Sequence, residues 1–175
     1  MILCLVPETI YTTNFMTAPF IREATLQDTA LILDFINALA VYEKLAHEVE
    51  TNEQMIAETL FWGNPKAHCL ICEIDGQPVG FALYFFNYST WKGRYGIYLE
   101  DLFVSPEHRG KGAGKALLVH IAGIAVANKC GRFEWSVLDW NTPSIEFYKS
   151  LGARPMHGWD IYRVDGEALE DLANK

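Results

Sequence analysis

The feature that most restricts the fold of this 175-residue chain is the glycine-rich segment Gly110–Gly114, in which three of five residues are glycine. The segment joins a strand-like run to the longest helix-like run. So many glycines are costly unless the backbone adopts positive φ angles or approaches another group closely. At a helix N-terminus such a loop presents free N–H groups and a partial positive charge, which suit an anion such as pyrophosphate. Arg109 and Lys111 add cations, so the segment predicts an anion-binding turn.

Two better-known phosphate loops have a different spacing. A Walker A loop needs Gly-x-x-x-x-Gly-Lys-Ser/Thr, and a dinucleotide fingerprint needs Gly-x-Gly-x-x-Gly in a parallel unit. Here Gly110, Gly112 and Gly114 follow what reads as an antiparallel meander. Nucleotide hydrolysis and hydride transfer are therefore disfavoured. A tight strand-to-helix turn without a ligand stays open as an alternative.

The order of expected elements predicts a mixed α/β domain with a central antiparallel meander. Thr25 and Asp28 form a variant of the capping box before a helix. Thr142 is the expected N-cap of a later helix that has Pro143 at its first position. The expected strands are 20–23, 67–74, 79–88, 95–104, 132–138 and 155–163, and the expected helices are 26–40, one within 43–58, 111–128, 143–151 and 166–173.

Composition and charge exclude several classes of protein. Half of the residues are apolar, which is enough to bury the core of a single domain. The formal charge is −8, from 22 acidic and 14 basic residues, so the surface repels nucleic acids and anionic membranes and attracts small cations. No apolar run is long enough to cross a bilayer. Residues 1–16 lack the basic start of a signal peptide and are interpreted as an N-terminal extension before a domain over 17–175.

The cysteines and histidines do not predict a metal site. Cys69 and Cys72 lie in an expected strand, where positions three apart point to opposite faces, and no second ligand pair follows at zinc-finger spacing. Buried free thiols are favoured, which suits a reducing cytoplasm. No metal-ligand spacing relates the histidines, which are His47, His68, His108, His120 and His157.

Three blocks of sequence together resemble the GNAT family of N-acetyltransferases, within it the spermidine/spermine (diamine) acetyltransferase subgroup. The family's acetyl-CoA loop reads Arg/Gln-x-x-Gly-x-Gly/Ala, matched by Arg109, Gly112 and Gly114. The second block is Tyr98-Leu-Glu-Asp-Leu-Phe-Val104, and the third is Trp140-Asn-x-Pro-Ser-Ile-x-Phe-Tyr-Lys149. The resemblance implies a mostly antiparallel, twisted central sheet flanked by helices.

The resemblance also implies acetyl-CoA as cosubstrate, with no metal. A β-bulge near Glu100 to Leu102 is expected, because splaying one strand from its neighbour exposes main-chain groups for the pantetheine arm and thioester. The implied cofactor-binding residues are Leu102, Phe103, Val104, Arg109, Gly110, Lys111, Gly112, Ala113, Gly114, Lys115, Asn141 and Ser144.

An alkylamine with a pKa of about 10.4 is almost wholly protonated at pH 7, so the reaction needs a proton acceptor. By resemblance Glu100 is a water-mediated base, and Tyr148 is the acid that protonates the leaving thiolate. Tyr148 as a mere packing residue is the alternative. The implied substrate-binding residues are Tyr42, Glu43, Glu100, Asp101, Glu134 and Trp135, of which the last two differ from the animal enzymes.

The expected function is direct transfer of an acetyl group to a primary amine of a small cationic molecule, such as a polyamine or a thialysine-like compound. A homodimer is expected from the resemblance. Two alternatives stay open. One is acetylation of a protein or peptide amine, or of an aminoglycoside-like compound, and the other is a non-catalytic acyl-CoA sensor.

Overall fold

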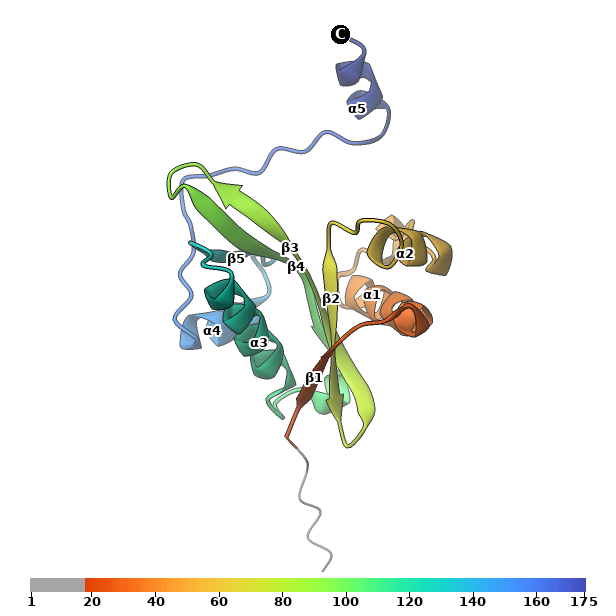
Figure 1. Ribbon diagram of the computed structural model, residues 1–175, viewed down its shortest axis with the longest axis vertical. Coiled ribbons are helices and arrows are strands. Elements are labelled where there is room, and N and C mark those ends of the chain that lie inside the picture. The colour runs from red at the N-terminus through yellow and green to blue at the C-terminus, as the bar shows by residue number, and fades with distance from the viewer. Residues whose placement is uncertain (1–17) are drawn as a thin grey trace, which may run out of the picture. The chain divides into compact units, whose positions relative to one another are not determined.

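The structure is a computed structural model that describes residues 18–175. The chain divides by its internal contacts into two compact units, one that ends at Ser136 and one over Val137–Lys175, and each is described by itself (Figure 1). The expected extension over 1–16 lies outside the described residues. The expected single domain over 17–175 stays a prediction.

The first unit is built on a five-stranded sheet in the order β1-β2-β3-β4-β5. Neighbouring strands from β1 to β4 are antiparallel, and β5 is parallel to β4. The fold is therefore the expected mixed α/β type with a mostly antiparallel sheet. The strands are β1 Phe20–Glu23, β2 His68–Ile74, β3 Gln77–Ser89, β4 Arg94–Val104 and β5 Phe133–Trp135.

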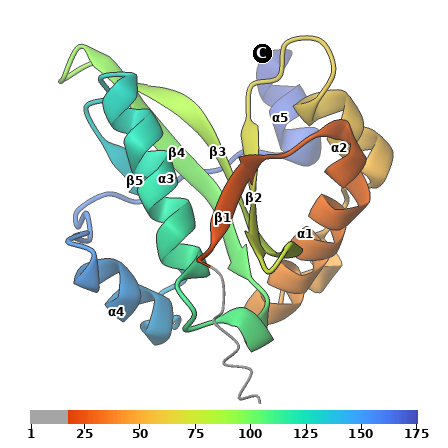
Figure 2. The ribbon, with the colours of Figure 1, turned by 60° about the horizontal axis from the view of Figure 1, so that its bottom comes forward.

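Helices cover both faces of this sheet. Figures 1 and 2 show α1 and α2 on one face and α3 on the other. The first expected helix begins as a 3₁₀ turn and continues to Glu43, beyond the expected end at residue 40, and Lys44 then takes a left-handed φ of 65°. The helical segments are η1 Leu26–Asp28, α1 Thr29–Glu43, η2 Ala46–Glu48, α2 Glu53–Leu60, η3 Pro106–His108 and α3 Ala113–Ala127.

The core under α1 and α2 is aromatic and aliphatic. Phe35 of α1 stacks on Phe81 of β3, with ring centroids 5.6 Å apart, and also contacts Phe103 of β4 at 5.9 Å. Ile71 of β2 is fully buried beside them. Stacked and tilted aromatic pairs of this kind add to the hydrophobic stabilisation of the core. They hold α1 against the sheet, and they thereby set where its last turn lies.

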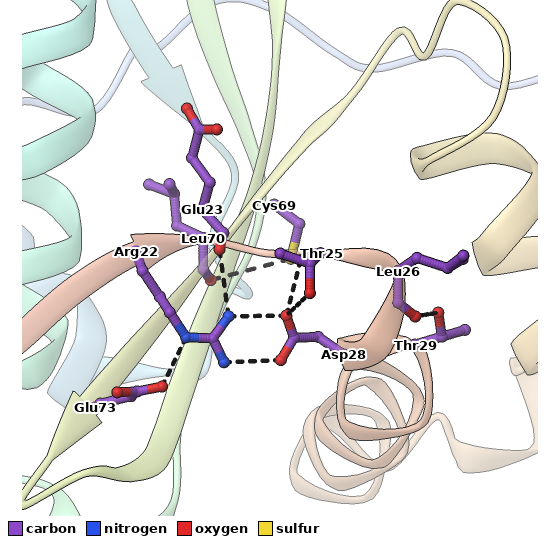
Figure 3. Close-up of polar contacts among 9 residues, drawn as sticks. All are labelled: Arg22, Glu23, Thr25, Leu26, Asp28, Thr29, Cys69, Leu70 and Glu73. Atoms are coloured by element: carbon purple, nitrogen blue, oxygen red, sulfur yellow. Dashed lines mark hydrogen bonds and ion pairs between the residues drawn. The ribbon is translucent and has the colours of Figure 1, made fainter.

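A polar network ties β1 to the start of α1 and to β2 (Figure 3). Asp28 accepts hydrogen bonds from the backbone N–H and the hydroxyl of Thr25, which confirms the expected capping box. Arg22 lies between the carboxylates of Asp28 and Glu73. The network fixes the entry of the chain into α1.

The second unit contains α4, Thr142–Ser150, and α5, Gly166–Ala173. Both helices were expected, but the N-cap of α4 is Asn141 and not Thr142. The Asn141 side-chain oxygen accepts a hydrogen bond from the Ser144 backbone N–H at 3.3 Å. Asparagine is among the strongest N-cap residues, so the helix begins one residue earlier than expected.

The strand expected over 155–163 does not form. These residues have no regular secondary structure, and large apolar side chains stay exposed along them, including Ile161 and Tyr162. A strand is stabilised by main-chain hydrogen bonds to a neighbouring strand, and the second unit contains no other strand. Apolar residues in this segment alone were not sufficient for the strand to form.

Within residues 18–175, no helix is both long and apolar enough to cross a membrane.

Candidate active site

A β-bulge interrupts the pairing of β3 with β4. Leu83 pairs with Asp101 and Tyr84 pairs with Leu99, which leaves Glu100 as the extra residue. The expected bulge near Glu100 to Leu102 is thus confirmed. A bulge adds one residue to one strand, so the alternation of side chains between the two faces of the sheet shifts by one residue across the bulge.

The bulge decides which acidic side chain faces the core under α1. After it, Asp101 and Phe103 share the sheet face covered by α1 and α2, because Phe103 belongs to the core that contains Phe35. Before it, Leu99 is buried on the opposite face. Glu100 itself is exposed, whereas Asp101 is partly buried.

Three carboxylates from two elements lie close enough to interact electrostatically. Burial, followed by the negative charges of Glu100 and Glu43, raises the pKa of Asp101 to about 6. Burial also raises the pKa of Glu43, in the last turn of α1. Such a group of carboxylates attracts a cationic amine, and it contains a proton acceptor whose pKa is close to neutrality.

Arg109 connects the glycine-rich loop to α1. Its guanidinium lies 4.7 Å from the ring centroid of Tyr42 and 5.8 Å from that of Phe103. Its Nε also donates a hydrogen bond to the Val104 carbonyl at 2.9 Å. The structure therefore brings Arg109 of the expected cofactor loop together with Tyr42 of the expected amine site.

The glycine-rich loop has the geometry of an anion-binding turn. Gly110 and Gly112 have φ angles of 74° and 90°, which are unfavourable for residues with a Cβ. Gly112 is the N-cap of the 15-residue helix α3, and no side chain caps this end. The N–H groups of the first turn, with the exposed Lys111 and Lys115, fit the pyrophosphate of acetyl-CoA.

The end of β4 has an open main-chain edge next to this loop. The strand β5 pairs only with Ile97, Tyr98 and Leu99 of β4. No described strand pairs with that edge over residues 100–104, so its main-chain groups have no strand partner, and the Val104 carbonyl accepts the Arg109 Nε–H instead. This fits the expected role of Leu102, Phe103 and Val104 toward the pantetheine arm, although the Phe103 side chain belongs to the core and is 4% exposed.

The expected substrate residues on β5 have protein partners. Glu134 forms an ion pair with Arg132 at 2.9 Å and accepts a weaker hydrogen bond from Asn87 at 3.4 Å. The Trp135 ring packs edge-on against Phe133, with centroids 5.0 Å apart. Their part in substrate binding stays a prediction.

The remaining expected residues belong to the second unit. Asn141 is buried and caps α4, with Ser144 in the first turn of the same helix. Tyr148 lies in the last turn, where its carbonyl accepts hydrogen bonds from the N–H groups of Leu151 and Ala153. The cofactor contacts of Asn141 and Ser144 and the acid role of Tyr148 stay predictions.

Sequence reasoning did not include Cys69 and Leu83 in the site. They lie in the same cross-strand row as Asp101, because Cys69 pairs with Leu83 and Leu83 pairs with Asp101. The order of strands and the position of the bulge would have identified this row. Cys69 and Cys72 are buried free thiols, as expected, and burial raises their pKa values to about 12 and about 11.

The match to known proteins agrees with this geometry. Residues 33–153 match the acetyltransferase (GNAT) family. The chain therefore belongs to the GNAT acetyltransferase family and is an acetyltransferase. Acetyl-CoA is the acetyl donor used by this family.

Two relatives and one solved structure are similar to nearly the whole chain. A thialysine N-epsilon-acetyltransferase of Sus scrofa is 43% identical over 171 residues, which are 91% of this chain and 100% of the relative. An L-ornithine N5-acetyltransferase of Arabidopsis thaliana is 31% identical, over 95% of this chain and 92% of the relative. Among solved structures, an integron cassette protein from the mobile metagenome of V. cholerae is similar with a TM-score of 0.75 at 29% identity, over 91% of this chain and 99% of that one.

Proposed function

We propose that this enzyme transfers the acetyl group of acetyl-CoA to a primary amine of a small cationic molecule, such as thialysine, ornithine or a polyamine. The observation that carries the proposal is the group of carboxylates at the β4 bulge, next to the open edge of β4 and to the loop at the N-terminus of α3. Relatives that act on thialysine and ornithine cover nearly the whole chain and support the same substrate class.

The two ends of the site have opposite charges, which suits a reaction between an anionic donor and a cationic acceptor. Lys111, Lys115 and the first turn of α3 hold the pyrophosphate. Bound acetyl-CoA supplies the acetyl thioester, whose carbonyl is polarised by a main-chain N–H of residues 102–104. Glu43 and Asp101 hold the ammonium group of the acceptor. Tyr148 protonates the leaving thiolate.

The test is acetyl-CoA-dependent release of CoA with a panel of amines: spermidine, spermine, putrescine, thialysine, ornithine, lysine and a peptide. Turnover of at least one of the free diamines or diamino acids is the expected result. Turnover of the peptide alone would assign the enzyme to peptide acetylation. Tight binding of acetyl-CoA without turnover of any amine would favour an acyl-CoA sensor.

The enzyme is further proposed to act as a homodimer in the cytoplasm. Tyr88 and Tyr95 pair edge-to-face at the end of the β3–β4 hairpin, and 53% and 59% of their surfaces are exposed. Exposed aromatic side chains of this kind are typical of protein contacts. Light scattering in solution should give twice the chain mass of 19.8 kDa. The buried free thiols suit a reducing compartment, which fractionation of the cells that make the protein would test.

A further inference from the structure

We propose that Arg109 couples the binding of acetyl-CoA to the binding of the amine through its contact with Tyr42. The inference rests on the proposed function, in which the amine binds at the last turn of α1. The resemblance assigns Arg109 to cofactor binding alone, and its contacts in the structure add a positioning role.

Contacts with two elements hold the Arg109 side chain. Its Nε donates a hydrogen bond to the Val104 carbonyl at the end of β4, at 2.9 Å. Its guanidinium lies 4.7 Å from the ring centroid of Tyr42 on α1 and 5.8 Å from that of Phe103 on β4. Both rings lie within the range at which an aromatic face attracts a cation. Arg109 therefore links the end of β4 to the last turn of α1.

At the cofactor end, Arg109 is directly attached to the pyrophosphate loop. It ends the short helical turn η3, where its backbone N–H donates to the Pro106 carbonyl at 3.2 Å. The next residue, Gly110, has a positive φ of 74°, and α3 begins at Ala113. A phosphate group bound by the N–H groups of this first helical turn fixes the loop. Binding of acetyl-CoA therefore also fixes the position of Arg109.

At the amine end, Tyr42 and Glu43 are the last two residues of α1. Helix ends fray, because their last carbonyl groups have no partner within the helix. The contact between Arg109 and the Tyr42 ring restrains this last turn. Since Tyr42 and Glu43 are neighbours in the same turn, the restraint also reduces the freedom of the Glu43 carboxylate, which the proposed function assigns to the ammonium group.

The two substrates therefore favour the same arrangement of Arg109 and Tyr42. Acetyl-CoA fixes the loop that carries Arg109, and the amine fixes the turn that carries Tyr42. Two ligands that favour one state bind more tightly together than alone, and the coupling acts equally in both directions. Its size is limited by the strength of the contact, which for a cation over an aromatic ring at an exposed site corresponds to about twofold to fivefold in affinity.

The experiment measures the affinity for CoA by calorimetry, with and without a saturating amine that the enzyme acetylates. CoA replaces acetyl-CoA so that no reaction occurs, and the ratio of the two dissociation constants is the coupling factor. We expect a factor of about two to five in the wild type and of about one in Arg109→Gln and Tyr42→Leu. Tyr42→Phe retains the ring face and should retain the wild-type factor. A cooperative thermal transition shows that each variant is folded.

Lys111→Ala is the matched control, because Lys111 belongs to the same loop and is exposed. This variant should weaken CoA binding and keep the coupling factor, which separates coupling from a simple loss of cofactor contacts. A factor of one in the wild type, a wild-type factor in Arg109→Gln, or a factor that is also lost in Lys111→Ala would overturn the proposal. Absence of turnover with every amine would instead contradict the proposed function itself.

Discussion

The guanidinium of Arg22 donates two hydrogen bonds to the carboxylate of Asp28, at 2.8 and 2.7 Å, and thereby joins β1 to the start of α1 (Figure 3). The Arg22 Nε also donates to Glu73 of β2 at 2.6 Å. These bidentate and charge-assisted bonds are the strong kind of hydrogen bond. They fix the helix whose far end carries Tyr42 and Glu43.

Asp28→Asn should destabilise the protein at neutral pH. The Arg22 hydrogen bonds lower the pKa of Asp28 to about 2, so its ionised form contributes about 2 kcal/mol of stability. This contribution is present above the unfolded pKa near 4 and disappears as the pH falls toward 2. Urea unfolding at several pH values would measure it. A stability difference between wild type and variant that did not shrink in acid would contradict the ion-pair account.

Asp101→Asn should stabilise the protein at neutral pH while it lowers activity. The pKa of Asp101 is higher in the folded state than the ordinary value of 3.8, so the wild type loses stability as the pH rises from about 4 to about 6. The variant should be about 1–2 kcal/mol more stable at pH 7.5 and equal to the wild type at pH 4. Thermal unfolding at the two pH values is the measurement. Equal stability at both would mean that Asp101 is not destabilised by its surroundings.

Gly112→Ala should weaken acetyl-CoA binding. The positive φ of 90° at Gly112 costs an alanine about 1 kcal/mol, and relaxation would displace the first N–H groups of α3. The KM for acetyl-CoA should rise several-fold. Gly123→Ala is the matched control, since Gly123 lies within the same helix without a positive φ and with open space around it. The control should gain about 0.5–1 kcal/mol in stability with an unchanged KM.

Tyr42→Leu should impair the cofactor loop, whereas Tyr42→Phe should not impair it. The ring under the Arg109 guanidinium provides a cation–π contact of about 0.5–1 kcal/mol, and phenylalanine retains it. The KM for acetyl-CoA should rise about twofold to fivefold in the leucine variant alone. Equal values in both variants would show that the contact does not position Arg109.

Tyr148→Phe should lower kcat by about 100-fold near neutral pH, because the leaving thiolate loses its proton donor. The affinity for acetyl-CoA should stay unchanged. Tyr162→Phe is the control, since Tyr162 is 92% exposed and is assigned no role in the reaction. Full kcat in Tyr148→Phe would show that Tyr148 is a packing residue and not the proton donor.

Local patterns predicted the elements that depend on neighbours in the chain. The apolar periodicity of residues 26–40 and the Thr25–Asp28 capping box predicted the first helix. The expected strands 67–74 and 79–88 left room only for a short turn, and Asp75 and Gly76 take positive φ there. The glycine-rich segment likewise predicted the positive φ angles of the loop at Gly110 and Gly112. These features depend on backbone preferences and short-range hydrogen bonds, which a few consecutive residues contain.

The local sequence did not decide features that depend on contacts between residues far apart in the chain. Residues 155–163 were predicted as a strand and did not form one, because a strand needs a partner that its own unit lacks. The cap of α4 was predicted at Thr142 and lies at Asn141, through a contact with Ser144 only three residues away. For residues 155–163 the local sequence does not contain the deciding contact.

Within the site, Glu100 and Asp101 at the bulge show the same distinction between what the local sequence determines and what the tertiary structure determines. The sequence by itself determined the chemistry that is available: two adjacent carboxylates before a glycine-rich loop, with a third at residue 43. Only the tertiary structure decided that Asp101 faces the core of α1 while Glu100 remains exposed. The physical reason is that a pKa depends on the dielectric and the charges around a group, and these come from β2, β3 and α1.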